Sequence, residues 1–456
     1  MQWGFLREHS SMAVTEDTDF DERNSAMARK RPEKLSISFP IWALFDTAPG
    51  GKYADMERFV AEHAERGFNC IRFDDGAGLI HDKDGKLRKS VPILEPYSGY
   101  SSNIRQMWNF GNGGDCDMFG RLVKMLEFAK KYDIYVILSS WYYLHTYWFF
   151  GDELRNLELH AIPVHDRFMF FAMELDRILS ALRDLGLIDR IAAAEILNEA
   201  DGLPFINGYG QANGLSVETL HKFRDDHEKA LAYLQERHPD VIFAYDSYTP
   251  YTDINLMPRN MQMWNFHLYA MWGIYNLALE GDLLSPKVDI EKSPHYQNIM
   301  KYRTPDAAKS LADIRLSRMG RLPAEDWVRR VWIYSGLDPA KIPELDKLFC
   351  EAFDKHEHLF RERLMEGLQQ AAALRAEVAP DIPWTLAEGI TYCGSNLISW
   401  EEYHPGYWDF LEYSIDCYKK VGLDGCVIRT CCGPEDPCWD VCKDKLLYLN
   451  RKFQSK

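Results

Sequence analysis

The chain has no long uninterrupted hydrophobic run. No stretch approaches the roughly 18 consecutive apolar residues that a membrane span requires, so the sequence does not predict a membrane protein. Residues 1–33 are polar and charged and contain no apolar core of a secretory signal. The 10 cysteines are therefore expected to be reduced thiols, and the expected location is cytoplasmic.

Two ligand-binding patterns are also missing. No paired C-x-x-C spacing occurs among the cysteines near the C-terminus, which are Cys426, Cys431, Cys432, Cys438 and Cys442. No glycine-rich phosphate loop opens any predicted helix, which disfavours an open doubly wound nucleotide-binding sheet. The sequence therefore predicts neither a metal site nor a cofactor.

Positive charge is in deficit. The chain has 53 Lys and Arg against 69 Asp and Glu, for a net charge of −16, which argues against nucleic acid or an anionic membrane as a partner. Hydrophobic residues make up 46% and charged residues 27%, as in a soluble globular protein with a large core. The 13 Trp and 24 Tyr suit a site that stacks aromatic rings on a carbohydrate.

Strands and helices alternate along the chain after the polar extension of residues 1–33. Apolar runs predict eight strands, and helical spacing of apolar residues predicts long helices between several of them. Eight alternating strands favour a parallel sheet closed as a (β/α)₈ barrel over residues 34–456. The predicted strands are 35–44, 68–73, 134–140, 191–197, 241–245, 261–267, 383–387 and 425–429, and the helices include 53–66, 118–132, 164–185 and 220–236.

An insertion of about 270–380 separates the sixth and seventh predicted strands. It is charged and helical in pattern, with a clear helix over 344–378. Its place beside the barrel mouth makes it a candidate lid or dimer arm, so a homo-oligomer stays an open option.

Polar and aromatic residues recur at the predicted carboxyl ends of the strands, where barrel enzymes carry their chemistry. Glu199 follows the fourth strand, in Ile196-Leu197-Asn198-Glu199, and Glu388 follows the seventh. Each glutamate could be merely a polar stop after a core strand, but two that converge on one cleft could cleave a glycosidic bond. The other candidates are Trp42, Arg72, Asp74, Trp141, Asn198, Asp246, His267, Tyr269 and Arg429.

With these residues in place, the chain resembles the clan A glycoside hydrolases, the cellulase-like (β/α)₈ family. Their signature is Asn-Glu after strand four and Glu after strand seven, here Asn198-Glu199 and Glu388. The resemblance implies that Glu199 is the general acid/base and Glu388 the nucleophile of a retaining β-glycosidase. It also implies a raised pKa for Glu199, set by burial, and donors that keep Glu388 ionised.

The resemblance assigns supporting roles as well. Arg72 and Tyr269 would donate hydrogen bonds to Glu388, and Asn198 would contact the sugar 2-OH. Two alternatives stay open, because Arg72 could pair with a neighbouring aspartate and His267 could be a satisfied core residue. Five tryptophans are candidate stacking platforms, of which two or three are expected to touch ligand: Trp141, Trp264, Trp272, Trp384 and Trp400.

The sequence departs from the cellulase pattern at two strands. The eighth ends in Arg429-Thr430 where the family has a Trp, with Trp439 displaced into the loop, and the third offers Ser139-Ser140-Trp141 without the expected His. Arg429 could bind an acidic or phosphorylated sugar, but we favour neutralisation of nearby carboxylates. The insertion and the loop over 98–114 would wall off the cleft, which favours short oligosaccharides or glycosides over polymers.

The leading hypothesis is thus a retaining, exo-acting β-glycosidase with a carbohydrate substrate. An endo-acting β-glucanase or mannanase shares the same chemistry. A non-catalytic carbohydrate-binding barrel is a different class. A metal-dependent barrel hydrolase would need several convergent ligands, and His267 alone is too few.

Overall fold

The computed structural model describes residues 31–46, 51–94, 113–202, 205, 207–209, 215–305, 325–334, 336–390, 395–430 and 432–455. The chain divides into two units, Met1–Pro32 and Glu33–Lys456. The second unit holds all of the secondary structure discussed below. Within the described residues, no helix is both long enough and apolar enough to span a membrane.

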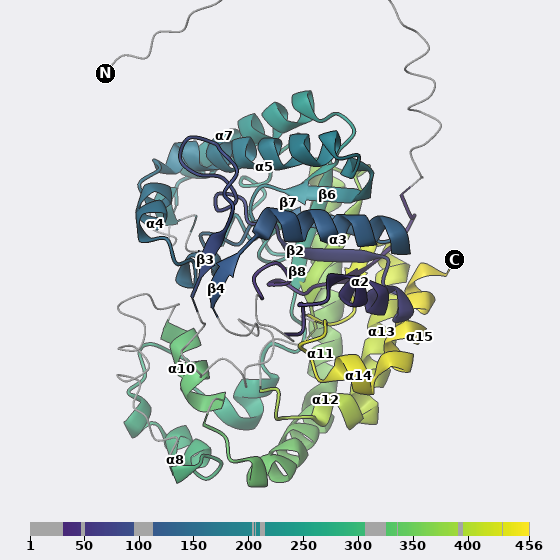
Figure 1. Ribbon diagram of the computed structural model, residues 1–456. Coiled ribbons are helices and arrows are strands. Elements are labelled where there is room, and N and C mark those ends of the chain that lie inside the picture. The colour runs from purple at the N-terminus through teal and green to yellow at the C-terminus, as the bar shows by residue number, and fades with distance from the viewer. Residues whose placement is uncertain are drawn as a thin grey trace, which may run out of the picture. The chain divides into compact units, whose positions relative to one another are not determined.

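The second unit is built on a closed barrel of eight parallel strands, which confirms the predicted (β/α)₈ fold (Figure 1). Around the barrel the strands run in the order β1-β10-β9-β8-β7-β6-β5-β2. In chain order they are β1 Leu35–Ser38, β2 Cys70–Asp74, β5 Tyr135–Ser139, β6 Ile191–Glu195, β7 Phe243–Ser247, β8 Met263–Leu268, β9 Trp384–Gly389 and β10 Gly425–Val427. A separate antiparallel pair, β3 Val91–Ile93 and β4 Gly114–Cys116, follows the second barrel strand.

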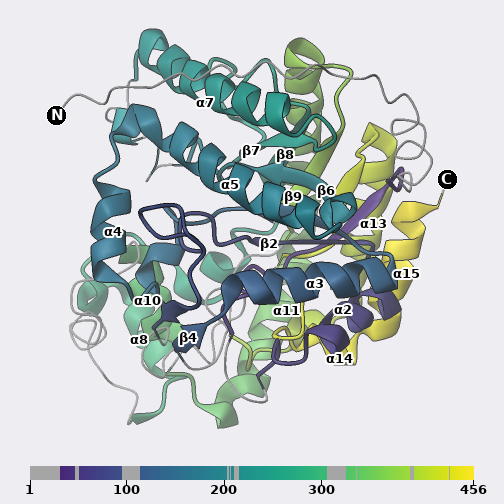
Figure 2. The ribbon, with the colours of Figure 1, turned by 45° about the horizontal axis from the view of Figure 1, so that its top comes forward.

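The barrel helices are α2 Met56–Glu65, α3 Met118–Tyr132, α4 Glu153–His160, α5 Arg167–Asp184, α7 Val217–Arg237, α13 Pro405–Val421 and α15 Lys443–Gln454, with two short helices, α12 Trp400–Tyr403 and α14 Cys438–Val441. Four of them, α2, α3, α5 and α7, agree closely with the helices predicted over 53–66, 118–132, 164–185 and 220–236. Local signals set their ends: Asp55 caps α2 by accepting the Arg58 N–H, and Gly67 after the helix has a φ of 79°. Helices α5 and α7 lie side by side on the barrel (Figures 1 and 2).

The segment between β8 and β9 is helical in its described parts. It contains α8 Pro294–Met300, α10 Glu325–Tyr334 and the 37-residue α11, Ile342–Val378. The last of these agrees with the helix predicted over 344–378. Both ribbon views place α8 and α10 together, away from α7, while α11 runs from them along the barrel (Figures 1 and 2).

One predicted strand is wrong in its extent. The sequence predicts a strand over 35–44, but β1 ends at Ser38 and residues 41–45 form a turn. Pro40 explains the early end, because it has no N–H to donate to a strand ladder. The predicted wall over 98–114 lies almost wholly outside the described residues, which resume at 113.

Candidate active site

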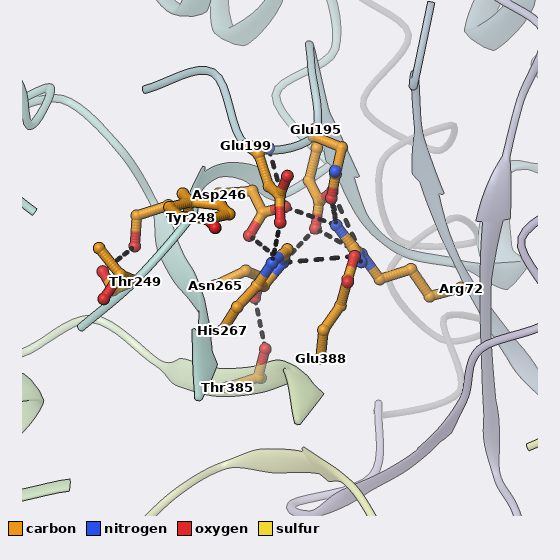
Figure 3. A network of polar contacts seen from close by, with 12 residues as sticks. Arg72, Glu195, Glu199, Asp246, Tyr248, Thr249, Asn265, His267, Thr385 and Glu388 are labelled. Atoms are coloured by element: carbon orange, nitrogen blue, oxygen red, sulfur yellow. Dashed lines mark hydrogen bonds and ion pairs between the residues drawn. The ribbon is translucent and has the colours of Figure 1, made fainter. Parts of the chain in front are cut away.

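Glu199 lies in a strained turn just after strand β6. Its φ of 47° is in the left-handed region that residues other than glycine rarely adopt. The Glu199 N–H donates to the Asp246 carboxylate at 3.3 Å, and its carbonyl accepts the N–H of Gly202 at 2.6 Å. These two bonds hold the turn, so the Glu199 carboxylate is directed into the polar network at the end of the barrel (Figure 3).

Glu388 reaches the same network because of a bulge between β8 and β9. Phe266 pairs with Leu386, but the next residue, His267, pairs with Glu388, so Ala387 is an extra residue in β9. Side chains alternate between the two faces of a strand, and the extra residue shifts Glu388 onto the inward face. Its side chain therefore points toward His267 and Arg72 (Figure 3).

Arg72 connects acidic side chains from three barrel strands. Its fully buried guanidinium donates from Nη2 to Glu195 at 2.8 Å and to Asp246 at 2.6 Å, and from Nη1 to Glu388 at 3.0 Å. Nη2 also donates to the side-chain oxygen of Asn198 at 2.6 Å. Buried cations are stable only when they are paired in this way, so Arg72 organises acidic groups from three strands.

Arg72 therefore does not depend on the alternative partners that the sequence suggested. Asp74 accepts the N–H of Gly76 at 2.9 Å, and Asp75 accepts the N–H of Ala77 at 2.7 Å. The guanidinium stacks instead on the ring of Trp141, with 4.6 Å between the guanidinium carbon and the ring centroid. The structure thus places both Arg72 and Trp141 beside the carboxylate pair.

His267 lies between the two glutamates. Its Nδ1 is 2.7 Å from Glu199, and its Nε2 is 3.1 Å from Asp246 and 3.5 Å from Glu388. Burial alone would lower the pKa of His267, but the charges of Asp246 and Glu388 outweigh burial and hold it well above 6.5. These carboxylates thus favour the protonated ring, whose Nδ1 is hydrogen-bonded to Glu199 and whose Nε2 faces Asp246 and Glu388.

Both glutamates are tuned toward the protonated form. Burial raises the pKa of Glu199 above its ordinary value of 4.5, and the hydrogen bond from His267 opposes only part of this effect. Burial also raises the pKa of Glu388, against the opposing charges of His267 and Arg72. The expected donors to Glu388 are thus present, but they do not bring its pKa below the ordinary value. Because each carboxylate also disfavours charge on the other, the pair is suited to hold one proton.

Two further predicted residues lie in the network. The Tyr269 hydroxyl donates to the second oxygen of Glu388. The Asn198 side chain is oriented by its bond to Arg72 and lies one residue before Glu199. The structure thus brings Tyr269, Asn198 and Asp246 together around Arg72 and Glu388.

Other predicted residues lie elsewhere. Trp384 is the first residue of β9, and its indole N–H donates to the Gly422 carbonyl at 3.0 Å, so it packs at the amino end of the barrel. Trp264 stacks on Trp384 there, with 6.4 Å between ring centroids. Neither ring can serve as a stacking platform at the carboxyl ends of the strands.

Arg429 has a separate set of partners. Its buried guanidinium lies 2.6 Å from Glu401 and 3.0 Å from Asp436. This arrangement agrees with the favoured role of neutralising nearby carboxylates. The displaced Trp439 packs on His63 and Arg66 of the outer helix layer, with 4.6 Å between the Trp439 and His63 ring centroids.

The sequence reading missed an inner polar layer beneath the glutamates. Asn265 donates to Glu195 and accepts from the Thr385 hydroxyl, and all three residues are buried inside the barrel (Figure 3). These residues belong to the strands themselves, so a search of the segments that follow the strands does not find them. The available signal was a polar residue within a largely apolar strand, at a position that alternation places on the inward face.

One group of described residues has the spacing of a metal site. Glu199, His267 and Glu388 each present an atom within 4.8 Å of the others. However, the Arg72 guanidinium lies 3.0 Å from Glu388. A metal ion would be placed beside this buried positive charge, so the donor set fits proton transfer better than metal binding.

The (β/α)₈ barrel, with Glu199 in the turn after its fourth strand and Glu388 on its seventh, has the architecture of the clan A glycoside hydrolases. The family model described as sugar-binding cellulase-like matches residues 39–274. This match spans more than half of the chain, and the protein belongs to that family. Among curated proteins, none matches the sequence.

Solved structures are similar to this chain at low sequence identity. A Parabacteroides distasonis protein, described provisionally as a glycoside hydrolase, is 17% identical with a TM-score of 0.61; the match covers 93% of this chain and 94% of that one. An endo-1,4-β-D-mannanase from Thermotoga petrophila is 11% identical with a TM-score of 0.39, covering 86% and 87%. Endo-glycoceramidase II from Rhodococcus is 12% identical with a TM-score of 0.43, covering 91% and 78%.

Proposed function

We propose that this protein is a retaining, exo-acting β-glycosidase that cleaves short oligosaccharides or glycosides. The observation that carries the proposal is the short separation of the two glutamates. One oxygen of Glu199 and one of Glu388 lie within 4.8 Å of each other. Retaining enzymes hold their carboxyl groups about 5–5.5 Å apart, whereas inverting enzymes need about 6.5–9.5 Å to admit a water molecule.

In the first step, Glu199 protonates the glycosidic oxygen while Glu388 attacks the anomeric carbon. The bond from that carbon to the leaving group breaks, and an ester to Glu388 forms. In the second step, Glu199 takes a proton from water, and the water oxygen displaces Glu388. The product keeps the β configuration, and both carboxyl groups return to their starting states.

The surrounding residues fit these steps. Donors from Arg72 and Tyr269 hold Glu388 on the attacking side and accept its change in charge without reorganisation. The His267 ring donates to Glu199 at 2.7 Å, so it orients the acid and stabilises its ionised form after proton transfer. Burial raises the pKa of Glu199, which favours the protonated form that a general acid needs.

The proposal of exo action rests on the segment between β8 and β9. Tyr269 and Trp272 follow β8 directly, and the long excursion through α8, α10 and α11 continues from them. A segment of this size beside the pair favours a blocked pocket over an open groove. An endo-acting β-glucanase or mannanase is the alternative within the same chemistry, and a sugar-binding barrel without turnover is the alternative outside it.

The central test replaces each glutamate with its amide. Glu199→Gln and Glu388→Gln should each lower kcat on an aryl β-glycoside by several orders of magnitude, because one lacks the acid and the other lacks the nucleophile. Added azide should restore turnover of Glu388→Ala and give an α-glycosyl azide, which NMR identifies. Glu412→Gln, on the outer face of α13, serves as the matched surface control.

Full activity in either active-site variant would rule out double displacement at this pair. A screen of the wild type over aryl glucoside, galactoside, mannoside, xyloside and glucuronide identifies the sugar. Tight binding of an oligosaccharide with no turnover of any aryl glycoside would instead favour the sugar-binding barrel. Release of single sugars, rather than internal fragments, from a reduced oligosaccharide would distinguish exo from endo action.

A further inference from the structure

A short turn after strand β7 presents two exposed aromatic rings at the carboxyl end of the barrel. Tyr248 is 46% exposed and Tyr251 is 56% exposed, although buried tyrosines abound elsewhere in this chain. Strand β7 lies beside β6, whose following turn carries Glu199. Figure 3 places Tyr248 on the Glu199 side of the polar network, away from Arg72.

The turn is tied to the turn of the acid/base residue. The Asp201 carboxylate accepts the N–H of Tyr248 at 2.8 Å and the hydroxyl of Thr252 at 2.5 Å. Asp201 lies two residues after Glu199, so one side chain links the two turns. Within the tyrosine turn, the Tyr251 N–H donates to the Thr249 hydroxyl at 3.3 Å. The rings thus stand on a braced backbone and keep a defined position relative to Glu199.

Another exposed aromatic ring, that of Trp272, lies on the side of Glu388. Trp272 packs on Tyr269, with 5.7 Å between ring centroids, and Tyr269 donates to Glu388. The general acid protonates the leaving oxygen, so the leaving group must lie on the side of Glu199 rather than of Glu388.

We infer that Tyr248 and Tyr251 form a binding subsite for the leaving group, and that this group is a sugar ring. The inference rests on the proposed function, because it assigns the leaving-group side from the role of Glu199. An aromatic ring with a polar edge matches the apolar C–H face and hydroxyl rim of a pyranose. The Thr249 hydroxyl, half-buried in the same turn, adds a polar group that suits a sugar better than a purely aryl group.

The subsite can be measured after the first chemical step has been isolated. A 2-deoxy-2-fluoro glycosyl fluoride of the sugar found in the screen traps the enzyme as an ester on Glu388. The trapped enzyme recovers when water attacks the sugar and displaces Glu388. It also recovers when a hydroxyl of an added sugar displaces Glu388 and forms a new glycosidic bond. In both cases Glu199 receives the proton. The ratio of the acceptor-driven rate to the water-driven rate reports binding at the leaving-group side.

With the β-methyl glycoside of the same sugar as acceptor, the wild-type recovery rate should rise and then saturate. In Tyr248→Ala and Tyr251→Ala, the ratio of the two rates should fall by about 10-fold, the scale of one lost aromatic contact. Tyr248→Phe and Tyr251→Phe should keep the ratio within about twofold, which separates the ring from its hydroxyl. The matched control is Tyr403→Ala, at an exposed tyrosine that ends α12.

An unchanged ratio in both alanine variants, with native circular dichroism, would overturn the subsite while leaving the proposed function intact. Faster recovery with 2-phenylethanol than with the sugar at equal concentration would mean an aryl leaving group and would also overturn it. If the wild type is never trapped on Glu388 and turns over no aryl glycoside, both the proposed function and the subsite fail.

Discussion

At the scale of single residues, the buried carboxylates of the site outnumber its two basic side chains, Arg72 and His267. Glu195, Asp246 and Glu388 all lie within 3.0 Å of the Arg72 guanidinium, and Glu199 is bonded to His267. Burial without such partners would drive each carboxylate to the neutral form. The cations therefore allow the site to hold several negative charges while one proton remains available for transfer.

Asp74, on β2 beside this network, offers a measurable effect of pH on stability. Burial raises its pKa from 3.8 to about 6, against hydrogen bonds from Thr146 and Gly76. Between pH 4 and 6 the folded state therefore binds more protons at this group than the unfolded state, so its contribution to stability falls as pH rises. Relative to Asp74→Asn, the wild type should lose up to about 3 kcal/mol of unfolding free energy across this window.

Urea unfolding of both proteins at several pH values measures this difference. Asp84→Asn, on the exposed turn after β2, is the control and should follow the wild type in its pH dependence. A constant difference between wild type and Asp74→Asn from pH 4 to 7 would contradict the raised pKa.

Sequence reasoning identified the site residues near the predicted carboxyl ends of the strands. It missed Glu195 and Asn265, which lie beneath the two glutamates. Asn198, Glu199 and Glu388 follow apolar runs, so their positions show at once where strands end. Glu195 lies inside such a run, and nothing in its immediate neighbours reveals that Arg72 faces it across the barrel. That pairing depends on the register of strands that are 123 residues apart in the chain.

At the scale of elements, the strands and helices were largely readable because each is apolar on the faces it buries. The 37 residues of α11 and the 15 residues of α3 show their periodicity over many turns. The bulge at Ala387 was not readable, since it arises from the pairing of β9 with β8 rather than from a local signal. Yet this one extra residue determines that Glu388 faces the barrel interior.

The loops after β9 and β10 depend on the Arg429 cluster. Arg429→Gln removes the positive charge that pairs with Glu401 and Asp436, all of them buried. Loss of one partner of a buried ion pair should lower the unfolding free energy by about 3–5 kcal/mol. Arg58→Gln removes the cation of an exposed pair with Glu62 and should have little effect.

Thermal and urea unfolding measure this loss, and steady-state kinetics distinguish the two roles of Arg429. If Arg429 only neutralises its neighbours, KM for a neutral aryl glycoside and for an aryl glucuronide should change alike. A selective rise in KM for the glucuronide, with wild-type stability, would show that Arg429 binds an acidic sugar.

At the scale of the whole molecule, we expect residues 33–456 to unfold as one cooperative unit. Helix α11 packs on both β8 and α13, so the segment between β8 and β9 shares its core with the barrel. A chain that starts at Glu33 should have the same urea midpoint as the full chain, with coincident transitions by far-ultraviolet circular dichroism and tryptophan fluorescence. The full-length protein is the reference for both probes.

Two separated transitions would instead indicate that the segment between β8 and β9 folds as its own domain. A lower midpoint on removal of residues 1–32 would mean that the polar extension docks on the barrel. Light scattering in the same samples tests the open option of a homo-oligomer.

The ion pairs of Arg72 also constrain the order in which the barrel can assemble during synthesis of the chain. Its partners Glu195, Asp246 and Glu388 lie 123, 174 and 316 residues further along the sequence. A growing chain synthesises the arginine early and its last anionic partner late, so the interior cannot close around this charge until β9 has been made. The carboxylate pair is therefore completed late in biosynthesis, and the barrel closes only after β10, which pairs with both β1 and β9, has also been made. A chain that stops before Glu388 would hold a buried cation short of one partner, and it would be a natural target for quality control.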